Sequence, residues 1–297
     1  MDASDGTPTD RWAVAMLRRV ARPALQTSRG KAPIWHVAAA TVVSVIFLLP
    51  LWLMIVGSLR RVGAPPAVGP EWIPADLAWQ NYVRVFETVP LARFAANSLL
   101  VAAVAVPLGV VVASWAGFAV ARLPSRHASL ILVCCAIAIL SPASALVLGR
   151  VAIWRVLDLA DTPVPLMATG LVGGTPLAVL LFAWAFRRLP EHLFDLAREI
   201  GLSPFQTWRR VALPLVRPIT VAAAALAFLV SWGAYTEPLV VLSTDRWFTV
   251  PFALRSLASL DAPLRPLMLA GAVICTAPVV VAFFVILRFV GRSAPVD

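Results

Sequence analysis

Six long stretches without a charged residue constrain the fold of this chain more than any other feature of its sequence. A helix needs about 20 apolar residues to cross the ~30 Å hydrocarbon layer of a membrane, and the stretches match that length. Lipid offers the backbone no hydrogen-bond partners, so each stretch must be helical. The chain is therefore predicted to be an all-α polytopic membrane protein with six transmembrane helices. They are expected at Val37–Leu59, Phe94–Ala121, Ala128–Gly149, Thr162–Phe186, Pro218–Thr236 (extending past Glu237 to Thr244) and Pro266–Leu287.

The composition agrees with this class, and the basic residues predict the orientation. Only 13% of residues are charged, against about 25% in soluble domains. Six spans place both termini on one side, which carries 16 of the 25 Lys and Arg residues. Cytoplasmic loops are enriched in these residues, so both termini are expected in the cytoplasm. The chain then divides into a basic cytoplasmic tail (1–35), a six-span domain (36–291) and a cytoplasmic tail (292–297). The net charge of +10 thus reflects orientation, and we expect no nucleic-acid partner.

Several kinds of site are not expected in this sequence. A Walker A loop requires Gly-Lys-Ser/Thr, but the single lysine, Lys31, is followed by Ala32. Nucleotide is therefore not expected to bind by that route. The three histidines and three cysteines show no metal-ligand spacing. The spans contain no catalytic cluster of the kind an intramembrane enzyme needs. We expect no cofactor, no metal and no enzymatic activity in this chain.

The segment 187–218 is the longest connection between spans on the predicted cytoplasmic side. Pro190 suits the first turn of a helix, and apolar residues then recur at helical spacing from Leu193 to Ile200. Gly201 is a natural helix stop, and Ser203-Pro204 can begin a second short helix. Acidic residues on the polar face disfavour a helix that lies in anionic lipid headgroups. The pattern predicts two short helices that dock on a soluble partner.

This loop resembles the EAA loop of ATP-binding-cassette importer permeases, in which a coupling helix sits in a groove of the ATPase subunit. Asp195-Leu196-Ala197 stands at the Glu-Ala-Ala position, Gly201 at the glycine and Leu213-Pro214 at the closing Leu-Pro. The resemblance implies that ATP is bound by a separate subunit. It also implies that the coupling residues are Asp195, Leu196, Ala197, Glu199, Gly201, Leu213 and Pro214.

The resemblance covers about residues 35–291 and is strongest to the smaller six-span subunit of maltose-permease-like sugar importers. Asn81-Tyr82, Gly117–Arg122 and Ser231–Leu239 resemble stretches of that group. It implies a permease subunit in the bacterial inner membrane that forms the pathway for a carbohydrate. The implied partners are a second, homologous permease in a heterodimer, an ATPase dimer, an extracytoplasmic solute-binding protein and membrane lipid. Glu199-Ile200-Gly201 is closer to polyamine- and ferric-type permeases, so a polyamine, a glycerophosphodiester or another small polar solute is the alternative.

Glu237 is the acidic residue nearest the interior of a predicted span, and such a residue is by default a functional candidate. Together with Trp232 and Tyr235 it resembles a set of sugar contacts, and these three residues are the candidates for the substrate pathway. The alternative is that Glu237 lies at the outer interface and pairs with an arginine. Asn97 and Ser98 are expected to form contacts between helices. A secondary transporter is the other functional alternative, but the sequence lacks its paired repeats and charged mid-membrane residues.

Overall fold

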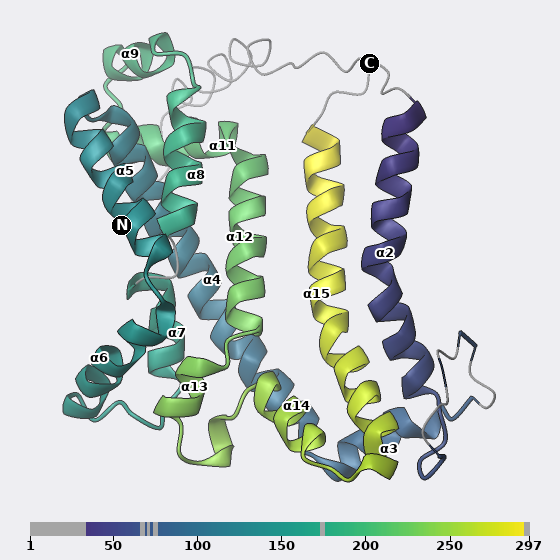
Figure 1. Cartoon of the computed structure of the whole chain (residues 1–297). Coiled ribbons are helices and arrows are strands. Elements are labelled where there is room, and N and C mark those ends of the chain that lie inside the picture. The colour runs from purple at the N-terminus through teal and green to yellow at the C-terminus, as the bar shows by residue number, and fades with distance from the viewer. Residues whose placement is uncertain (1–33, 66–68, 70–71, 74–76, 173–175, 294–297) are drawn as a thin grey trace, which may run out of the picture.

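The computed structural model describes residues 34–293 except 66–68, 70–71, 74–76 and 173–175, and the described part contains no strand. The predicted tail at 1–35 therefore lies almost entirely outside the described residues, as does most of the tail at 292–297. The main helices are α2 (Ile34–Ser58), α3 (Gln80–Thr88), α4 (Leu91–Arg122), α5 (Ser125–Leu140), α6 (Ala143–Val156), α7 (Val164–Val172), α8 (Pro176–Arg187), α9 (His192–Glu199), α12 (Arg217–Trp232), α13 (Thr236–Val241), α14 (Val250–Ala258) and α15 (Arg265–Ser293). The all-α class is confirmed. Figure 1 shows long helices running between two ends: a loop end, which carries residues 187–218, and a distal end, which carries α3, α13 and α14.

Helix α4 is the centre of the bundle and packs against α7, α8 and α12. The close approach depends on glycines. A Cβ at position 117 would lie 2.5 Å from Cβ of Phe182 in α8. Gly170 in α7 lies against the backbone of Ala105 and Gly109 in α4. Small residues let helix backbones approach in a membrane, where dispersion contacts contribute much of the association.

A second core forms at the distal end, where α3, α4, α14 and α15 meet around Val85, Leu91 and Leu257. Helix α2 packs chiefly on α15, and both helices expose much apolar side-chain surface. Asn81 ties this region to the end of α2, because its side-chain amide donates to the carbonyl oxygens of Ser58 and Arg60 at 2.8 and 2.7 Å. Asn81 is buried, so these hydrogen bonds offset the cost of removing its amide from water.

The third predicted span has the wrong end: α5 stops at Leu140, not near Gly149. Pro142 restricts the preceding residue to extended conformations, and Ser141 has φ −72° and ψ 132°. The chain therefore leaves the helix there, and α6 begins after Pro142. An apolar sequence continues through this break, which is why the absence of charge did not reveal it.

The fifth predicted span is also divided. It begins after an 88° bend between the stretch Pro204–Leu215 and α12, and it ends at Trp232 with Gly233 as its C-cap. The expected extension to Thr244 is wrong, because residues 236–241 form the separate helix α13. Glu237 therefore lies in a short distal helix and not within α12.

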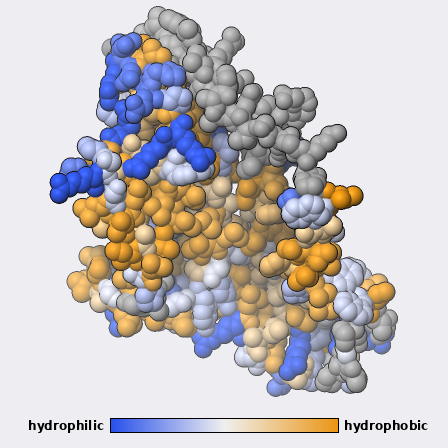
Figure 2. All heavy atoms as spheres, turned by 45° about the horizontal axis from the view of Figure 1, so that its top comes forward, coloured by the Kyte–Doolittle hydropathy of each residue, from blue (hydrophilic) through white to orange (hydrophobic). Residues whose placement is uncertain are grey.

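By length and composition, four stretches of the described chain can cross a membrane, and a fifth does so when the bent pair counts as one span. The four are Ile34–Ser58, Leu91–Arg122, Val164–Arg187 (which includes residues 173–175) and Ala262–Arg288. The third predicted span corresponds to α5, an apolar helix that is shorter than these four stretches. Figure 2 shows hydrophobic side chains in a broad band between hydrophilic ends on the face in view, as expected of a membrane protein.

Candidate functional site

Helix α9 ends in a turn that requires glycine. Gly201 has φ +76°, a left-handed conformation that glycine adopts without steric cost. Its N–H donates to the carbonyl of Arg198, and the N–H of Leu202 donates to the carbonyl of Ala197, both at 2.9 Å. These two bonds form a Schellman motif, which satisfies carbonyl groups left free at the helix end. The turn therefore fixes the direction in which the chain leaves α9.

One face of α9 is packed into the protein. Leu193, Phe194 and Ala197 are buried, which agrees with their three- and four-residue spacing. Leu193 packs with Val211 and Leu202 from the rest of the loop. Phe194 belongs to a larger cluster with side chains from α4, α8 and α12, including Phe118 and Phe182. The cluster mechanically joins α9 to three membrane helices.

The rest of the α9 surface is open, with charged side chains away from the bundle and two exposed apolar side chains at the edge of the buried face. Asp195, Arg198 and Glu199 are exposed, and Asp195 and Arg198 approach to only 3.5 Å. Leu196 and Ile200 are 39% and 45% exposed. Apolar side chains outside the buried stripe depart from the usual amphipathic pattern of a surface helix. The exposed residues of α9, hereafter the outer face of α9, have the composition of a docking surface.

The second half of the loop leads back to the membrane. Ser203 begins a capping box with Gln206, Thr207–Ala212 forms a π-helical segment, and Leu213 and Pro214 lie in the short helix α11 (Leu213–Leu215). Both side chains are partly buried next to the bend that begins α12. Of the seven coupling residues predicted from sequence, Ala197 thus packs inward, Asp195, Leu196 and Glu199 face outward, Gly201 makes the turn, and Leu213 and Pro214 form the junction with α12.

The three predicted pathway residues are not brought together. Trp232 is buried and donates from its indole nitrogen to the carbonyl of Cys275 in α15 at 3.0 Å. Tyr235 is partly exposed and lies beside the ring of Phe252. Glu237 pairs with Arg150 of α6, with 3.3 Å between carboxylate and guanidinium. This geometry agrees with the alternative reading of Glu237, and the pathway role of the three residues stays a prediction.

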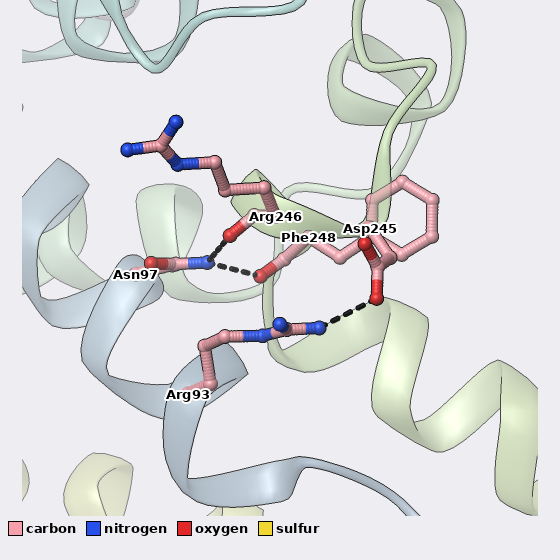
Figure 3. Close-up of polar contacts among 5 residues, drawn as sticks. All are labelled: Arg93, Asn97, Asp245, Arg246 and Phe248. Carbon is pink, nitrogen blue, oxygen red and sulfur yellow. Dashed lines mark hydrogen bonds and ion pairs between the residues drawn. The ribbon is translucent and has the colours of Figure 1, made fainter.

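Asn97 and Ser98 connect helix α4 to the segment before α14 (Figure 3). The Asn97 amide donates to the carbonyls of Arg246 and Phe248 at 2.9 and 3.0 Å. The Ser98 hydroxyl accepts from the N–H of Val250 at 2.9 Å. Arg93, one turn earlier, pairs with Asp245. The Ser98 bond joins α4 to the first residue of α14, as expected of a contact between helices, whereas Asn97 reaches backbone carbonyls of the segment before α14.

Asp161 was not singled out from the sequence, yet it joins two distal segments. It has φ 59°, and one carboxylate oxygen accepts from the N–H groups of Thr244 and Ser243 at 2.9 and 2.8 Å. These bonds lower the pKa of Asp161, chiefly the bond from Thr244, because they favour the charged form. An Asp before a Thr-Pro pair gives only a turn signal, so sequence could not reveal its distant partners.

Comparisons with known proteins agree with this geometry. The family described as binding-protein-dependent transport system inner membrane component matches residues 76–294. The chain is 27% identical to the trehalose transport system permease protein SugB of Mycobacterium tuberculosis, over 87% of this chain and 94% of that one. It is 28% identical to the arabinooligosaccharides transport system permease protein AraQ of Halalkalibacterium halodurans, over 83% and 89% of the two chains.

A solved structure shows the same fold. A chain in the crystal structure of a bacterial ABC transporter involved in the import of the acidic polysaccharide alginate aligns with a TM-score of 0.71 at 16% identity. The alignment covers 89% of this chain and 99% of that chain. The family match extends over most of the sequence and includes the whole loop with its glycine turn. The chain therefore belongs to the binding-protein-dependent transport system inner membrane components, the permease subunits of ATP-binding-cassette importers.

Proposed function

We propose that this permease forms the pathway for a carbohydrate and is driven by a separate ATPase that docks on the outer face of α9. The observation that carries the proposal is the two-sided packing of α9. Its buried side joins α4, α8 and α12, while its open side presents Leu196 and Ile200 among charged residues. A movement of a partner bound there would be transmitted to the membrane helices, because packed side chains transmit displacement.

The carbohydrate assignment is supported by the relatives, whose names specify trehalose and arabinooligosaccharides. A solute-binding protein would deliver the sugar at the distal end, and both termini with loop 187–218 would lie in the cytoplasm. The exposed apolar surfaces of α2 and α15 support contact with a second permease as well as lipid. We propose that this second permease is a different, homologous chain, and that nucleotide is bound by a dimer of the ATPase and not by this chain.

The class of solute is tested with the whole complex. The permease is purified with its co-expressed subunits and reconstituted in proteoliposomes with its binding protein. We expect a di- or oligosaccharide to stimulate ATP hydrolysis. Stimulation by a polyamine or a glycerophosphodiester, with none by sugars, would reject the carbohydrate assignment.

Docking is tested separately by substitution on the outer face of α9. Leu196→Glu introduces a charge into the proposed contact and should release the ATPase during purification. Leu157→Glu is the matched control, because Leu157 is also an exposed leucine but lies at the distal end after α6. Retention of the ATPase by Leu196→Glu at the level of Leu157→Glu would argue against docking at α9.

A further inference from the structure

A cavity of about 330 Å³ lies at the loop end between α4 and the loop. Its α4 wall is one helix face, formed by Trp115, Phe118, Ala119 and Arg122, which recur at three- and four-residue spacing. The opposite wall comes from the loop and includes Phe194, Arg198, Leu202, Pro204 and Thr207. The volume falls in the range of about 300–1,000 Å³ that is typical of ligand pockets. The cavity therefore has room for part of a small molecule.

The lining combines aromatic surface with two guanidinium groups. The guanidinium carbon of Arg122 lies 4.3 Å from the ring centre of Phe194, which holds the positive charge at the cavity wall. Arg198 enters from α9, and its contact with Asp195 is long and exposed, so little of its charge is neutralised there. The described residues that line the cavity include no acid. Such a site favours an anionic group attached to an apolar body.

The position of the cavity indicates where such a ligand would come from. Arg122 is the first charged residue after the uncharged stretch that begins at Phe94, so it marks the boundary between hydrocarbon and water. Trp115 lies two turns deeper, is 39% exposed, and its ring meets the exposed ring of Phe205. Anionic headgroups bind basic pockets at this depth, and acyl chains can lie against the aromatic surface below them.

We propose that this cavity binds an anionic phospholipid, with the headgroup phosphate at Arg122 and an acyl chain against Trp115. Arginine suits this role because its planar fork of donors matches phosphate oxygens. One wall is the end of α4 and the other is the coupling loop, so the bound lipid would hold the loop against the bundle. The lipid would thereby support the position of α9, whichever solute the importer carries.

The test uses the full-length chain with its co-purified subunits, in detergent, titrated with phosphatidylglycerol or phosphatidylcholine of the same acyl chains and followed by native mass spectrometry. Both lipids carry the phosphate, but phosphatidylcholine adds a choline cation that nearby guanidinium groups repel. We therefore expect phosphatidylglycerol to bind tighter by on the order of tenfold. Arg122→Gln should abolish this preference. Arg126→Gln is the matched control, because Arg126 is an exposed arginine at the same end that does not line the cavity.

Two further arms keep the assignment falsifiable. Ala119→Leu places a larger apolar side chain in the cavity and leaves every charge in place, so it should also weaken the preferential binding, even if Arg122→Gln fails to fold. Equal binding of the two lipids would overturn the proposal. So would an equal loss in Arg126→Gln, which would indicate diffuse attraction, or displacement of the lipid by millimolar inorganic phosphate, which would indicate a site for the free anion.

Discussion

Replacement of Gly201 by valine tests the turn that positions α9, the proposed coupling helix. Gly201 has φ +76°, and a Cβ added there would meet no heavy atom within 4 Å. The cost of a side chain is therefore backbone strain alone, without a clash. A non-glycine residue in this region costs on the order of 1–3 kcal/mol when the structure holds it there. Valine is among the worst residues for this conformation because it is β-branched.

The chain can avoid this strain only by opening the turn. It would then lose the hydrogen bonds from Gly201 to Arg198 and from Leu202 to Ala197, worth about 0.5–1.5 kcal/mol each. By either route, 1–3 kcal/mol corresponds to a roughly 5- to 150-fold loss of the correctly placed α9. Gly201→Val should thus lower transport per ATP hydrolysed, or release the ATPase, while membrane insertion stays normal.

The assay compares Gly201→Val with Gly201→Asn in proteoliposomes, measuring solute uptake and ATP hydrolysis in parallel. Asparagine tolerates the left-handed region several-fold better than other residues, so it adds a side chain with less strain. We expect Gly201→Asn to retain most of the coupling. If both variants couple transport to hydrolysis as the unchanged protein does, the turn does not position the coupling helix.

Three further predictions concern packing and the distal end. Gly117→Ala should destabilise the protein by about 1–3 kcal/mol in thermal unfolding, as overpacking does. Gly149→Ala should not, because a Cβ at Gly149 meets open space. Equal effects of the two substitutions would mean that Gly117 is not needed for close packing of α4 on α8. Glu237→Gln should lower the unfolding free energy by about 1–3 kcal/mol because it leaves Arg150 without its charged partner. A double-mutant cycle with Arg150→Gln should show coupling between the two residues. Additive effects would mean that the ion pair contributes nothing to stability. The folded-state pKa of Asp161 is lowered, so its contribution is present above the unfolded pKa near 3.9 and is lost as pH falls through the folded pKa. Hydrogen exchange at Ser243 and Thr244 should therefore accelerate, relative to neighbouring amides, only below about pH 4, and Asp161→Asn should remove that acid dependence.

The sequence was sufficient for the features that arise from local patterns. Uncharged runs located the membrane helices, because burial in lipid excludes charge along the whole segment. The periodicity from Leu193 to Ile200 and the stop at Gly201 located α9, because both are properties of neighbouring residues. Hydropathy alone misplaced the ends at Ser141 and Gly233, where the backbone turns within an apolar sequence.

The features that sequence could not supply depend on residues far apart in the chain. The sequence left Glu237 between a pathway role and a pair with an arginine, and only the fold could identify that arginine as Arg150. Likewise, Trp232 could not be assigned to its partner Cys275 before α12 and α15 were placed. The cavity beneath α9 likewise exists only because the end of α4 faces the loop. Such contacts are set by tertiary packing and leave no periodic signal.

The most direct test of the central claim is site-specific photocrosslinking from α9 in the assembled importer. A photoreactive amino acid at Leu196, on the outer face, should crosslink to the ATPase subunit, and the yield should change when nucleotide is added. The same group at Leu193, which is fully buried against Val211, should crosslink only within the permease. Crosslinks to the ATPase that arise elsewhere on the chain, with none from Leu196, would contradict the assignment of α9 as the element that couples ATP hydrolysis to transport.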